Sequence, residues 1–270
     1  MSKTIISGGC GKIKLIKYKG KPAIVKEIKI NIPDLPKNLS VYISKIGATT
    51  KKRYSNPIID SILSTEDEAK KMMDCRREVG DNIAEIYGYD KEKCEIYMKK
   101  YEGDLNNLKH SINLEEKYNI VLDIINGLHA MHSMKLIHAD LKCSNVLYEY
   151  DKTEERNVAY ITDFGISGFI NEDIRGYSPA YCPKFDDKLT EKYDIYCLGK
   201  TLSEFFCNLS ISQLTNLNYG NFPKFCTPES FGSKDFCNIV RKSLEDDPEE
   251  RPDLIDFIPP VIPMIAGIPF

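Results

Sequence analysis

The sequence predicts an α+β fold, with strands concentrated in the first hundred residues and helices in the remainder. Thr4–Lys17 and Pro22–Ile30 alternate or are rich in β-branched residues, and the Lys19–Gly20 turn joins them. Across Leu114–Met134, apolar residues recur at helical spacing, which indicates an amphipathic helix. A chain of 270 residues suits one large domain or a two-lobed fold and can bury a core without disulfides or metals.

The elements between these segments complete the predicted sheet. Asn82–Tyr89 and Cys94–Met98 read as two further strands, and we expect them to belong to a five-stranded antiparallel sheet. Thr65–Cys75 is predicted to be a helix, because apolar residues stand four and seven positions after Glu68. The segment 31–64 contains prolines and a basic run, so we expect a loop there, with a short helix from Asn56.

Composition limits the function classes. A net charge of −3 argues against a nucleic-acid partner, and the basic run Lys51–Arg53 reads as a solvated loop. The nine cysteines are odd in number and include no Cys-x-x-Cys pair, so we expect reduced thiols in a cytoplasmic compartment. The N-terminus lacks the apolar core of a signal peptide, and the tail 258–270 is too short and too rich in proline to span a bilayer.

Two motifs carry the chemistry. The run His138-Ala-Asp-Leu-Lys-Cys-Ser-Asn145 is followed by Asp163-Phe-Gly165, so that Asn145 lies five residues after Asp140 and eighteen before Asp163. Asp140 is a candidate base for a hydroxyl proton, Lys142 can steady a phosphate, and Asn145 and Asp163 offer hard oxygen ligands to Mg²⁺. Transfer of a phosphoryl group needs this combination because its transition state requires positioning and charge neutralisation more than covalent chemistry.

With these motifs the chain resembles the eukaryotic-type protein kinases. The resemblance covers residues 5 to 257 and implies a bilobal α+β fold, with a small antiparallel sheet lobe that carries one main helix and a larger, mainly helical lobe. It places the small lobe at 1–98 with an insertion at 31–64, the large lobe at 99–257 and an apolar tail at 258–270 in a single kinase domain. We expect this tail to pack on the large lobe.

The resemblance also implies an ATP site. Ile5–Ile13 is similar to the glycine-rich loop, although Ile6 stands where the first loop glycine usually falls. Lys26 matches the lysine that contacts phosphates, and Glu68 is our choice for its partner, with Glu66 and Glu78 as alternatives after a register shift. The other residues expected at the nucleotide are Ser7, Gly8, Gly9, Gly11, Ile13, Ile24, Met98 and Tyr101. In the family the hinge, Lys99–Tyr101 here, recognises adenine through backbone groups.

Several positions depart from the family pattern. Ala139 replaces an arginine that commonly pairs with a phosphorylated activation loop, so we expect activity that needs no such phosphorylation. Between Asp163 and Pro183 the hydroxyl candidates are Ser167, Tyr177 and Ser178. Lys184 stands where a glutamate usually pairs with the arginine matched by Arg251, and the pair would become a repulsion unless Asp186, Asp187 or another acid substitutes.

Other residues have scaffold roles by resemblance. His138 is a scaffold residue in the family, and Asp194 fits the helix that anchors the catalytic loop. His129 and His132 are assigned to helix packing, because no metal-ligand partners stand near them in the sequence. Ser178 could hydrogen-bond between Asp140 and Lys142, be an autophosphorylation site, or be a plain loop serine.

The resemblance implies a serine/threonine protein kinase that uses ATP and Mg²⁺, with Mn²⁺ as an alternative metal, on serine or threonine hydroxyls of protein substrates. Lys142 and the Ser178-Pro-Ala-Tyr181 loop favour serine/threonine over tyrosine. We expect a monomer with no nucleic-acid partner and no transmembrane segment. Two rivals remain open: a pseudokinase that binds nucleotide as a scaffold, and a small-molecule kinase of the aminoglycoside or choline type.

Overall fold

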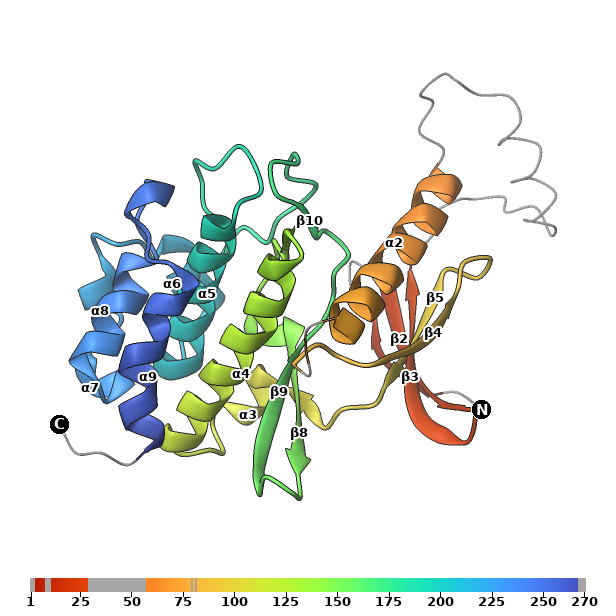
Figure 1. Ribbon diagram of the computed structural model, residues 1–270, viewed down its shortest axis with the longest axis horizontal. Coiled ribbons are helices and arrows are strands. Elements are labelled where there is room, and N and C mark those ends of the chain that lie inside the picture. The colour runs from red at the N-terminus through yellow and green to blue at the C-terminus, as the bar shows by residue number, and fades with distance from the viewer. Residues whose placement is uncertain (1–2, 8–10, 29–56, 79, 81, 267–270) are drawn as a thin grey trace. The chain divides into compact units, whose positions relative to one another are not determined.

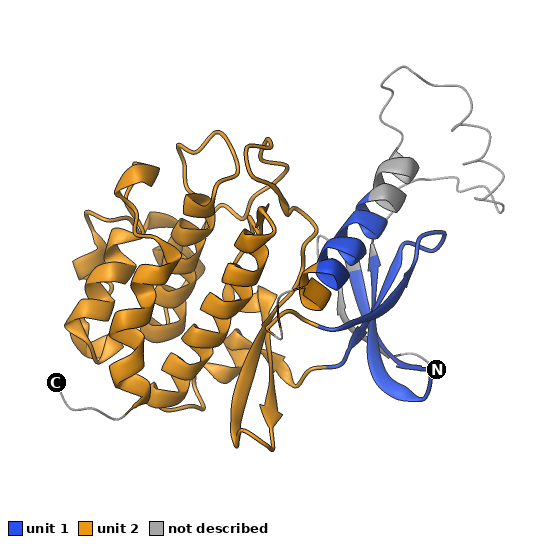
Figure 2. Cartoon of the chain, in the orientation of Figure 1, with its two compact units in different colours: residues 1–74, 85–100 blue, residues 75–84, 101–270 orange. Residues whose placement is uncertain are grey.

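The chain divides into two compact units, which are shown in Figure 2. Unit 1 comprises residues 1–74 and 85–100, and unit 2 comprises 75–84 and 101–270. The computed structural model describes residues 3–7, 11–28, 57–78, 80 and 82–266.

Unit 1 is a five-stranded antiparallel sheet with helix α2 (Figure 1). The strand order is β1-β2-β3-β5-β4. The strands are β1 (Lys3–Ser7), β2 (Gly11–Tyr18), β3 (Lys21–Ile28), β4 (Ile86–Asp90) and β5 (Glu95–Lys99), and the helix is α2 (Pro57–Glu78). The Lys19–Gly20 turn has positive φ at both residues, 47° and 83°, as a tight hairpin requires.

Three predicted boundaries in unit 1 are corrected. The stretch Thr4–Lys17 is two strands, β1 and β2. The predicted strand Asn82–Tyr89 begins only at Ile86, because Ile83 instead bridges Ile161 of unit 2. The short helix predicted from Asn56 in the segment 31–64 begins at Pro57, but it is not short, since as α2 it continues through the predicted Thr65–Cys75 helix to Glu78. The rest of that segment, up to residue 56, lies outside the described residues, as does the basic run Lys51–Arg53.

Unit 2 is mainly helical. Its helices are α3 (Leu105–Leu108), α4 (Leu114–Ser133), α5 (Glu191–Cys207), α6 (Ile211–Asn216), α7 (Pro228–Phe231), α8 (Lys234–Lys242) and α9 (Ile258–Ile265). Short strands are β6 (Gly103–Asp104), β7 (Leu136–Ile137), β8 (Val146–Asp151), β9 (Arg156–Ile161) and β10 (Gly168–Phe169). Four 3₁₀ turns are described, η1 (Cys143–Asn145), η2 (Phe222–Lys224), η3 (Pro248–Glu250) and η4 (Leu254–Phe257). The predicted α+β fold with a sheet part and a helical part is confirmed.

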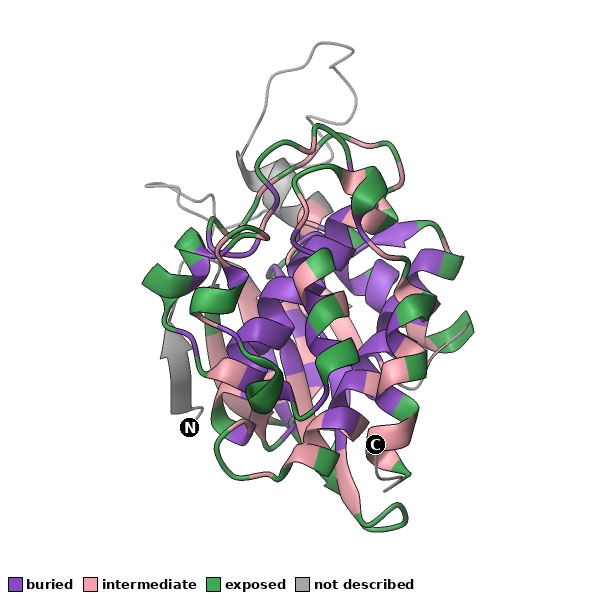
Figure 3. Ribbon diagram, turned by 90° about the vertical axis from the view of Figure 1, so that its left-hand side faces the viewer, coloured by how far each residue is buried: buried purple, intermediate pink, exposed green. Residues whose placement is uncertain are grey.

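The core of unit 2 lies around α4 and α5. The predicted helix across Leu114–Met134 is confirmed as α4, whose first turn is capped by the Asn113 side chain. Tyr118 of α4 donates a hydrogen bond to the Phe231 carbonyl at 2.7 Å, and its ring packs on Phe206 and Phe236. In Figure 3 the buried positions run along the inward faces of the helices, while the exposed positions gather on outward faces and loops. This core provides a rigid support for the loops that follow α4 and β9.

Asp123 ties β9 to α4. Its carboxylate accepts two hydrogen bonds from the Arg156 guanidinium, at 2.8 and 3.1 Å, and one from the Ala159 backbone N–H at 2.9 Å. Burial raises the pKa of Asp123, and the Arg156 charge acts in the opposite direction. Strand β8 follows the predicted metal ligand Asn145, and β9 precedes the other one, Asp163. Because β8 pairs with β9, the contacts of Asp123 fix both strands to the core.

The C-terminal segment differs from the expected proline-broken tail. Residues 258–265 form α9, because Pro259 and Pro260 stand in the first turn, where a missing N–H costs no hydrogen bond. Val261 is completely buried, and α9 lies beside α4 in Figure 1, so the predicted packing on the large lobe is confirmed for this part. Within the residues that the structure describes, no helix combines the length and apolarity needed to cross a bilayer.

Candidate active site

In unit 1, the predicted pairing of Lys26 with Glu68 is confirmed. Lys26 on β3 donates a hydrogen bond to Glu68 on α2 at 2.6 Å, and the side chains are 13% and 3% exposed. The alternatives have other partners: Glu66 pairs with Lys70 at 2.7 Å, and Glu78 accepts from Arg77 at 2.9 Å. The buried pair fixes the lysine side chain on one face of the sheet.

The strand register gathers the predicted adenine-site residues around Lys26. Ile13 on β2 lies directly opposite Lys26, and Met98 on β5 lies opposite Ile24. Because directly paired residues point to the same side of a sheet and alternate residues share a face, Ile13, Ile24, Lys26 and Met98 all project from one face. The sheet therefore places three apolar side chains beside one ammonium group.

The predicted glycine-rich loop is only partly described. Ser7 ends β1, Gly11 begins β2, and Ile6 pairs with Ile13 across the two strands. Gly8 and Gly9 lie outside the described residues. The remaining predicted residue, Tyr101, belongs to unit 2, where its ring is 8% exposed and packs on Tyr160 at 4.9 Å between centroids.

In unit 2, Asp194 anchors the catalytic loop, as predicted. Its carboxylate is fully buried and accepts hydrogen bonds from the backbone N–H groups of His138 at 2.8 Å and Ala139 at 2.9 Å. His132 Nε2 lies 2.9 Å from the same carboxylate, so its predicted packing role is confirmed. His129 is exposed on α4, and the predicted packing role is wrong for it.

Ala139 has a left-handed backbone conformation, with φ of 67°. A side chain with a Cβ atom is disfavoured there by about 1–2 kcal/mol. The two hydrogen bonds to Asp194 hold the loop in this geometry. The His138 Nδ1 atom also accepts a hydrogen bond from the Asp140 N–H at 3.1 Å.

The Asp140 carboxylate has two different oxygens. Oδ2 accepts hydrogen bonds from Lys142 Nζ at 2.6 Å and from Asn145 Nδ2 at 3.1 Å. Oδ1 is buried and has no hydrogen-bond partner among the described residues. A buried carboxylate oxygen without a donor is costly, so this atom is suited to a hydroxyl that arrives with a substrate.

Lys142 links Asp140 to the segment that follows the Asp-Phe-Gly motif. Its Nζ atom donates both to Asp140 and, at 2.9 Å, to Ser178 Oγ. Of the three readings of Ser178, the structure supports a hydrogen bond with Lys142, which in turn contacts Asp140. The Ser178 carbonyl accepts from the Tyr181 and Cys182 N–H groups, so a local turn holds the serine in place.

The predicted metal ligands follow β7 and β9. Asn145 uses its amide nitrogen to donate to Asp140, at 2.9 Å to the backbone carbonyl, which leaves the amide oxygen available to a cation. Asp163 is in the left-handed region with φ of 67°, and the next ring, Phe164, is 1% exposed and packs edge-on against His138. An amide oxygen and a carboxylate form the hard-oxygen set that suits Mg²⁺.

The hydroxyls of the segment 163–183 differ in access. Ser167 is fully buried and donates to the His138 carbonyl at 3.1 Å, whereas Tyr177 is 65% exposed. Tyr181, which sequence reasoning omitted, is buried and donates to Glu204 on α5 at 2.8 Å. Burial and the Glu204 charge raise the pKa of the Tyr181 phenol. Lys109 lies 3.5 Å from the other Glu204 oxygen. In the sequence, the feature that could have indicated this cluster is Glu204 itself, a single acidic residue near the apolar C-terminal end of α5.

Arg251 has an acidic partner in spite of Lys184. The guanidinium makes two hydrogen bonds of 2.8 Å to Asp186, with side-chain exposures of 0% and 3%. Lys184 is exposed, and so is Asp187. The expected repulsion is therefore absent, because Asp186 substitutes for the missing glutamate, one of the alternatives that the sequence left open.

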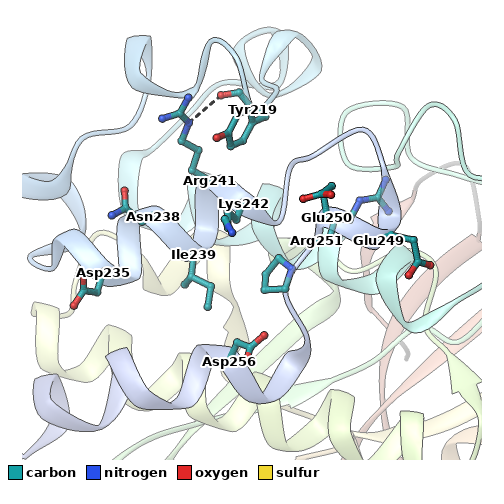
Figure 4. Close-up of a pocket in the computed structure, with 11 residues that line it drawn as sticks. Tyr219, Asp235, Asn238, Ile239, Arg241, Lys242, Glu249, Glu250, Arg251 and Asp256 are labelled. Atoms are coloured by element: carbon teal, nitrogen blue, oxygen red, sulfur yellow. Dashed lines mark hydrogen bonds between the residues drawn. The ribbon is translucent and has the colours of Figure 1, made fainter.

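A pocket of about 680 Å³ lies elsewhere in unit 2, between α8 and the segment 249–256 (Figure 4). Its lining mixes acids such as Asp235 and Glu250 with cations such as Lys242. None of Asp140, Lys142, Asn145 and Asp163 lines it. The catalytic candidates lie apart from it, between β7 and β8 and after β9.

The comparisons with known proteins agree with this geometry. The protein kinase domain family model matches residues 49–258, more than half of the chain and including every catalytic candidate of unit 2. A "Probable receptor-like protein kinase" of Arabidopsis thaliana is 27% identical over 66% of this chain and 26% of its own length. A "Probable serine/threonine-protein kinase" of Dictyostelium discoideum is 24% identical over 93% of this chain and 23% of its own length.

A "Dual serine/threonine and tyrosine protein kinase" of Danio rerio is 27% identical over 58% of this chain and 19% of its own length. The chain thus spans about a quarter or less of the length of these relatives. Together with the geometry of Asp140, Asn145, Asp163 and the Lys26–Glu68 pair, the family match shows that the chain belongs to the protein kinase domain family.

Proposed function

We propose that the protein transfers the γ-phosphate of ATP to serine or threonine hydroxyls of protein substrates. The observation that carries the proposal is the Asp140 carboxylate, with Oδ2 held by Lys142 and Asn145 while the buried Oδ1 lacks a partner. In this proposal Oδ1 accepts the proton of the attacking hydroxyl. Lys142 stays within reach of both Asp140 and the transferred phosphoryl oxygens.

Asn145 and Asp163 would hold Mg²⁺, with Mn²⁺ as an alternative of similar ligand preference. When bound, the metal would supply positive charge that neutralises the phosphate oxygens of ATP. In unit 1, Lys26 would contact the phosphates, and Glu68 would keep its ammonium group oriented. The apolar side chains of Ile13, Ile24 and Met98 on the same sheet face would surround the adenine, and backbone groups of 99–101 would recognise its edge.

Serine or threonine is favoured over tyrosine by the contact between Lys142 and Ser178. This hydrogen bond of 2.9 Å holds the Ser178–Tyr181 turn against the catalytic loop. The turn therefore lies close to Asp140, which Lys142 also contacts. The relatives include both serine/threonine kinases and dual-specificity kinases, so the choice of hydroxyl needs a direct test.

We also propose that activity needs no phosphorylation between Asp163 and Pro183. Ala139 offers no charge to a phosphate, and the segment is already held by backbone pairing of β10 with β7 and by hydrogen bonds between Asn171 or Glu172 and Leu189. Ser167 is buried and Ser178 is engaged by Lys142, so Tyr177 is the accessible hydroxyl of the three predicted candidates.

Transfer from labelled ATP with Mg²⁺ to matched serine and tyrosine peptides tests the proposal. Asp140→Asn should lower the rate at least about 100-fold, as expected on loss of a general base. Asp235→Asn, an exposed aspartate of the same unit with the same change in charge, should leave the rate unchanged. Equal rates for Asp140→Asn and wild type would contradict the role of Asp140. ATP binding without transfer in the wild type would favour the pseudokinase scaffold.

Phosphatase treatment before the assay tests independence from phosphorylation. Full activity after removal of all phosphate, checked by intact mass, is the expected result. Complete loss of activity that returns on incubation with ATP would show that a phosphate in this segment is needed. Tyr177→Phe separates the accessible tyrosine from other sites, because it removes the acceptor hydroxyl and keeps the ring.

A further inference from the structure

The sheet of unit 1 has a second face, opposite the one that carries Lys26. Because side chains alternate, Lys21, Ala23, Val25 and Glu27 of β3 project away from the face of Lys26 and Glu68. Figure 1 shows α2 against one side of this sheet. We call the other side the outer face. By register it comprises Lys12, Lys14, Ile16, Tyr18, Lys21, Ala23, Val25, Glu27, Gly88, Asp90, Glu95, Tyr97 and Lys99, with Lys19 and Tyr87 at its margin.

A row of three tyrosine rings crosses the outer face. Tyr18 stacks on Tyr97 at 4.9 Å between centroids and on Tyr87 at 6.0 Å. Ala23 and Val25 on the same face are 0% and 4% exposed, so the sheet side is apolar although its margin is charged. A half-buried aromatic row of this kind offers contact area to a partner at little cost in side-chain entropy.

Two lysines lie over rings of this row, and Lys12 lies on the same face toward the other end of β2. Lys19 Nζ lies 5.4 Å from the Tyr18 ring centroid, and Lys21 Nζ lies 5.9 Å from that of Tyr87. Both lysines are exposed, and so is Lys12. Cation–π contact holds an ammonium group over a ring but leaves its charge uncompensated by any anion.

The acids of the outer face are already engaged. Glu27 pairs with Lys14, Glu95 accepts from the Tyr97 hydroxyl at 2.6 Å, and Asp90 pairs with Lys93 at 2.9 Å. In the described part of the chain, Lys12, Lys19 and Lys21 have no carboxylate within ion-pair distance. A protein of net charge −3 therefore concentrates uncompensated positive charge on the face that carries the half-buried tyrosine row.

We propose that the outer face of unit 1 binds an acidic segment of a partner protein. Carboxylates of the segment would pair with Lys12, Lys19 and Lys21, and its apolar atoms would lie on the tyrosine row. A protein segment fits better than a nucleic acid, because Tyr18 already stacks on two other rings and its faces are therefore less open to bases.

The proposal concerns binding alone and stands apart from the proposed phosphoryl transfer. Its test therefore uses no ATP and no transfer step, so its failure would leave the kinase proposal untouched. The probe is a fluorescein-labelled octaglutamate peptide, and binding to the full chain is followed by fluorescence anisotropy at low and moderate salt.

The test variant is Lys19→Glu combined with Lys21→Glu. Two attractions become repulsions, so the dissociation constant should rise at least about tenfold. The matched control is Lys152→Glu combined with Lys234→Glu, two exposed lysines of unit 2 that give the same change in net charge. The control should change the dissociation constant less than about twofold at moderate salt, where distant charges are screened. Circular dichroism and thermal melting should match wild type for both, since all four side chains are exposed.

Three outcomes would overturn the proposal. Equal weakening by the two double variants would mean that the peptide senses net charge and has no site on the outer face. Absence of binding at about 1 mM peptide would exclude a useful affinity. Tighter binding of an oligothymidylate with the same number of charges, lost in the Lys19 and Lys21 variant, would assign the face to nucleic acid instead.

Discussion

Removal of the Asp186 carboxylate should destabilise unit 2 more than any other single charge change in this part of the chain. Arg251 has five N–H donors, and all five are used: two on Asp186 at 2.8 Å, and one each on the carbonyls of Glu245 at 2.8 Å, Lys192 at 3.0 Å and Asp246 at 3.1 Å. Asp186→Asn keeps the size of the side chain, removes the only formal negative charge among these partners and turns an amide N–H₂ toward the guanidinium.

The magnitude follows from burial. The Arg251 side chain is completely buried, so its charge cannot recover hydration when the carboxylate is lost. Loss of one partner from a buried ion pair costs about 3–5 kcal/mol, whereas a surface pair contributes about 0–1 kcal/mol. For a chain of this size, that corresponds to a fall in melting temperature of roughly 6 to 20 °C.

Urea unfolding followed by circular dichroism measures the effect, provided that the m-value is unchanged. Asp187→Asn is the matched control, since this neighbour is exposed, and its free energy of unfolding should stay within about 0.5 kcal/mol of wild type. A change below about 1 kcal/mol for Asp186→Asn would refute the argument. It would mean that the three carbonyl groups alone satisfy Arg251. No acid would then be needed in place of the glutamate that Lys184 replaces.

Three further predictions concern unit 2. Ala139→Gly should raise the free energy of unfolding by about 0.5–1 kcal/mol in urea titrations, because relief of the left-handed strain at φ of 67° exceeds the entropy cost of glycine; a loss of stability would contradict this. Tyr181→Phe should lower it by about 1–2 kcal/mol, because the buried Glu204 loses a donor, and an unchanged value would show that Lys109 suffices. Burial lowers the pKa of Lys200 from 10.5 to about 8. The unfolded chain therefore binds more protons between these pH values, and stability should rise with pH by up to about 3 kcal/mol, relative to Lys200→Met. Parallel pH curves for the two proteins would exclude this effect.

The catalytic loop shows how far local sequence reaches. The spacing of Asp140, Asn145 and Asp163 was sufficient to propose roles for them, because phosphoryl transfer requires a base and hard oxygen ligands at short, fixed separations along the chain. The pairing of Lys26 with Glu68 was harder, since 42 residues separate them and three acids on one helix were candidates. Only the register of β3 and the rotation of α2 select Glu68.

The boundaries that sequence reasoning placed wrongly have a common cause. Asn82–Ala84 looks like a strand, yet Ile83 is fully buried and bridges Ile161 instead of extending β4. The proline-rich stretch after Phe257 looks like an irregular tail, yet its first prolines suit a helix N-terminus that packs on α4. In both cases tertiary contact decided between local conformations that differ little in intrinsic propensity.

The sequence by itself determined the α+β class, the three candidate residues for catalysis and metal binding, and the departures at Ala139 and Lys184, because each depends on residue type and on spacing along the chain. The tertiary structure alone decided which acid neutralises Arg251, which oxygen of Asp140 lacks a donor, and which lysines lie over the tyrosine row of unit 1. These are facts about burial and direction. They depend on contacts between segments that are distant in the sequence, and the spacing of residues along the chain does not determine those contacts.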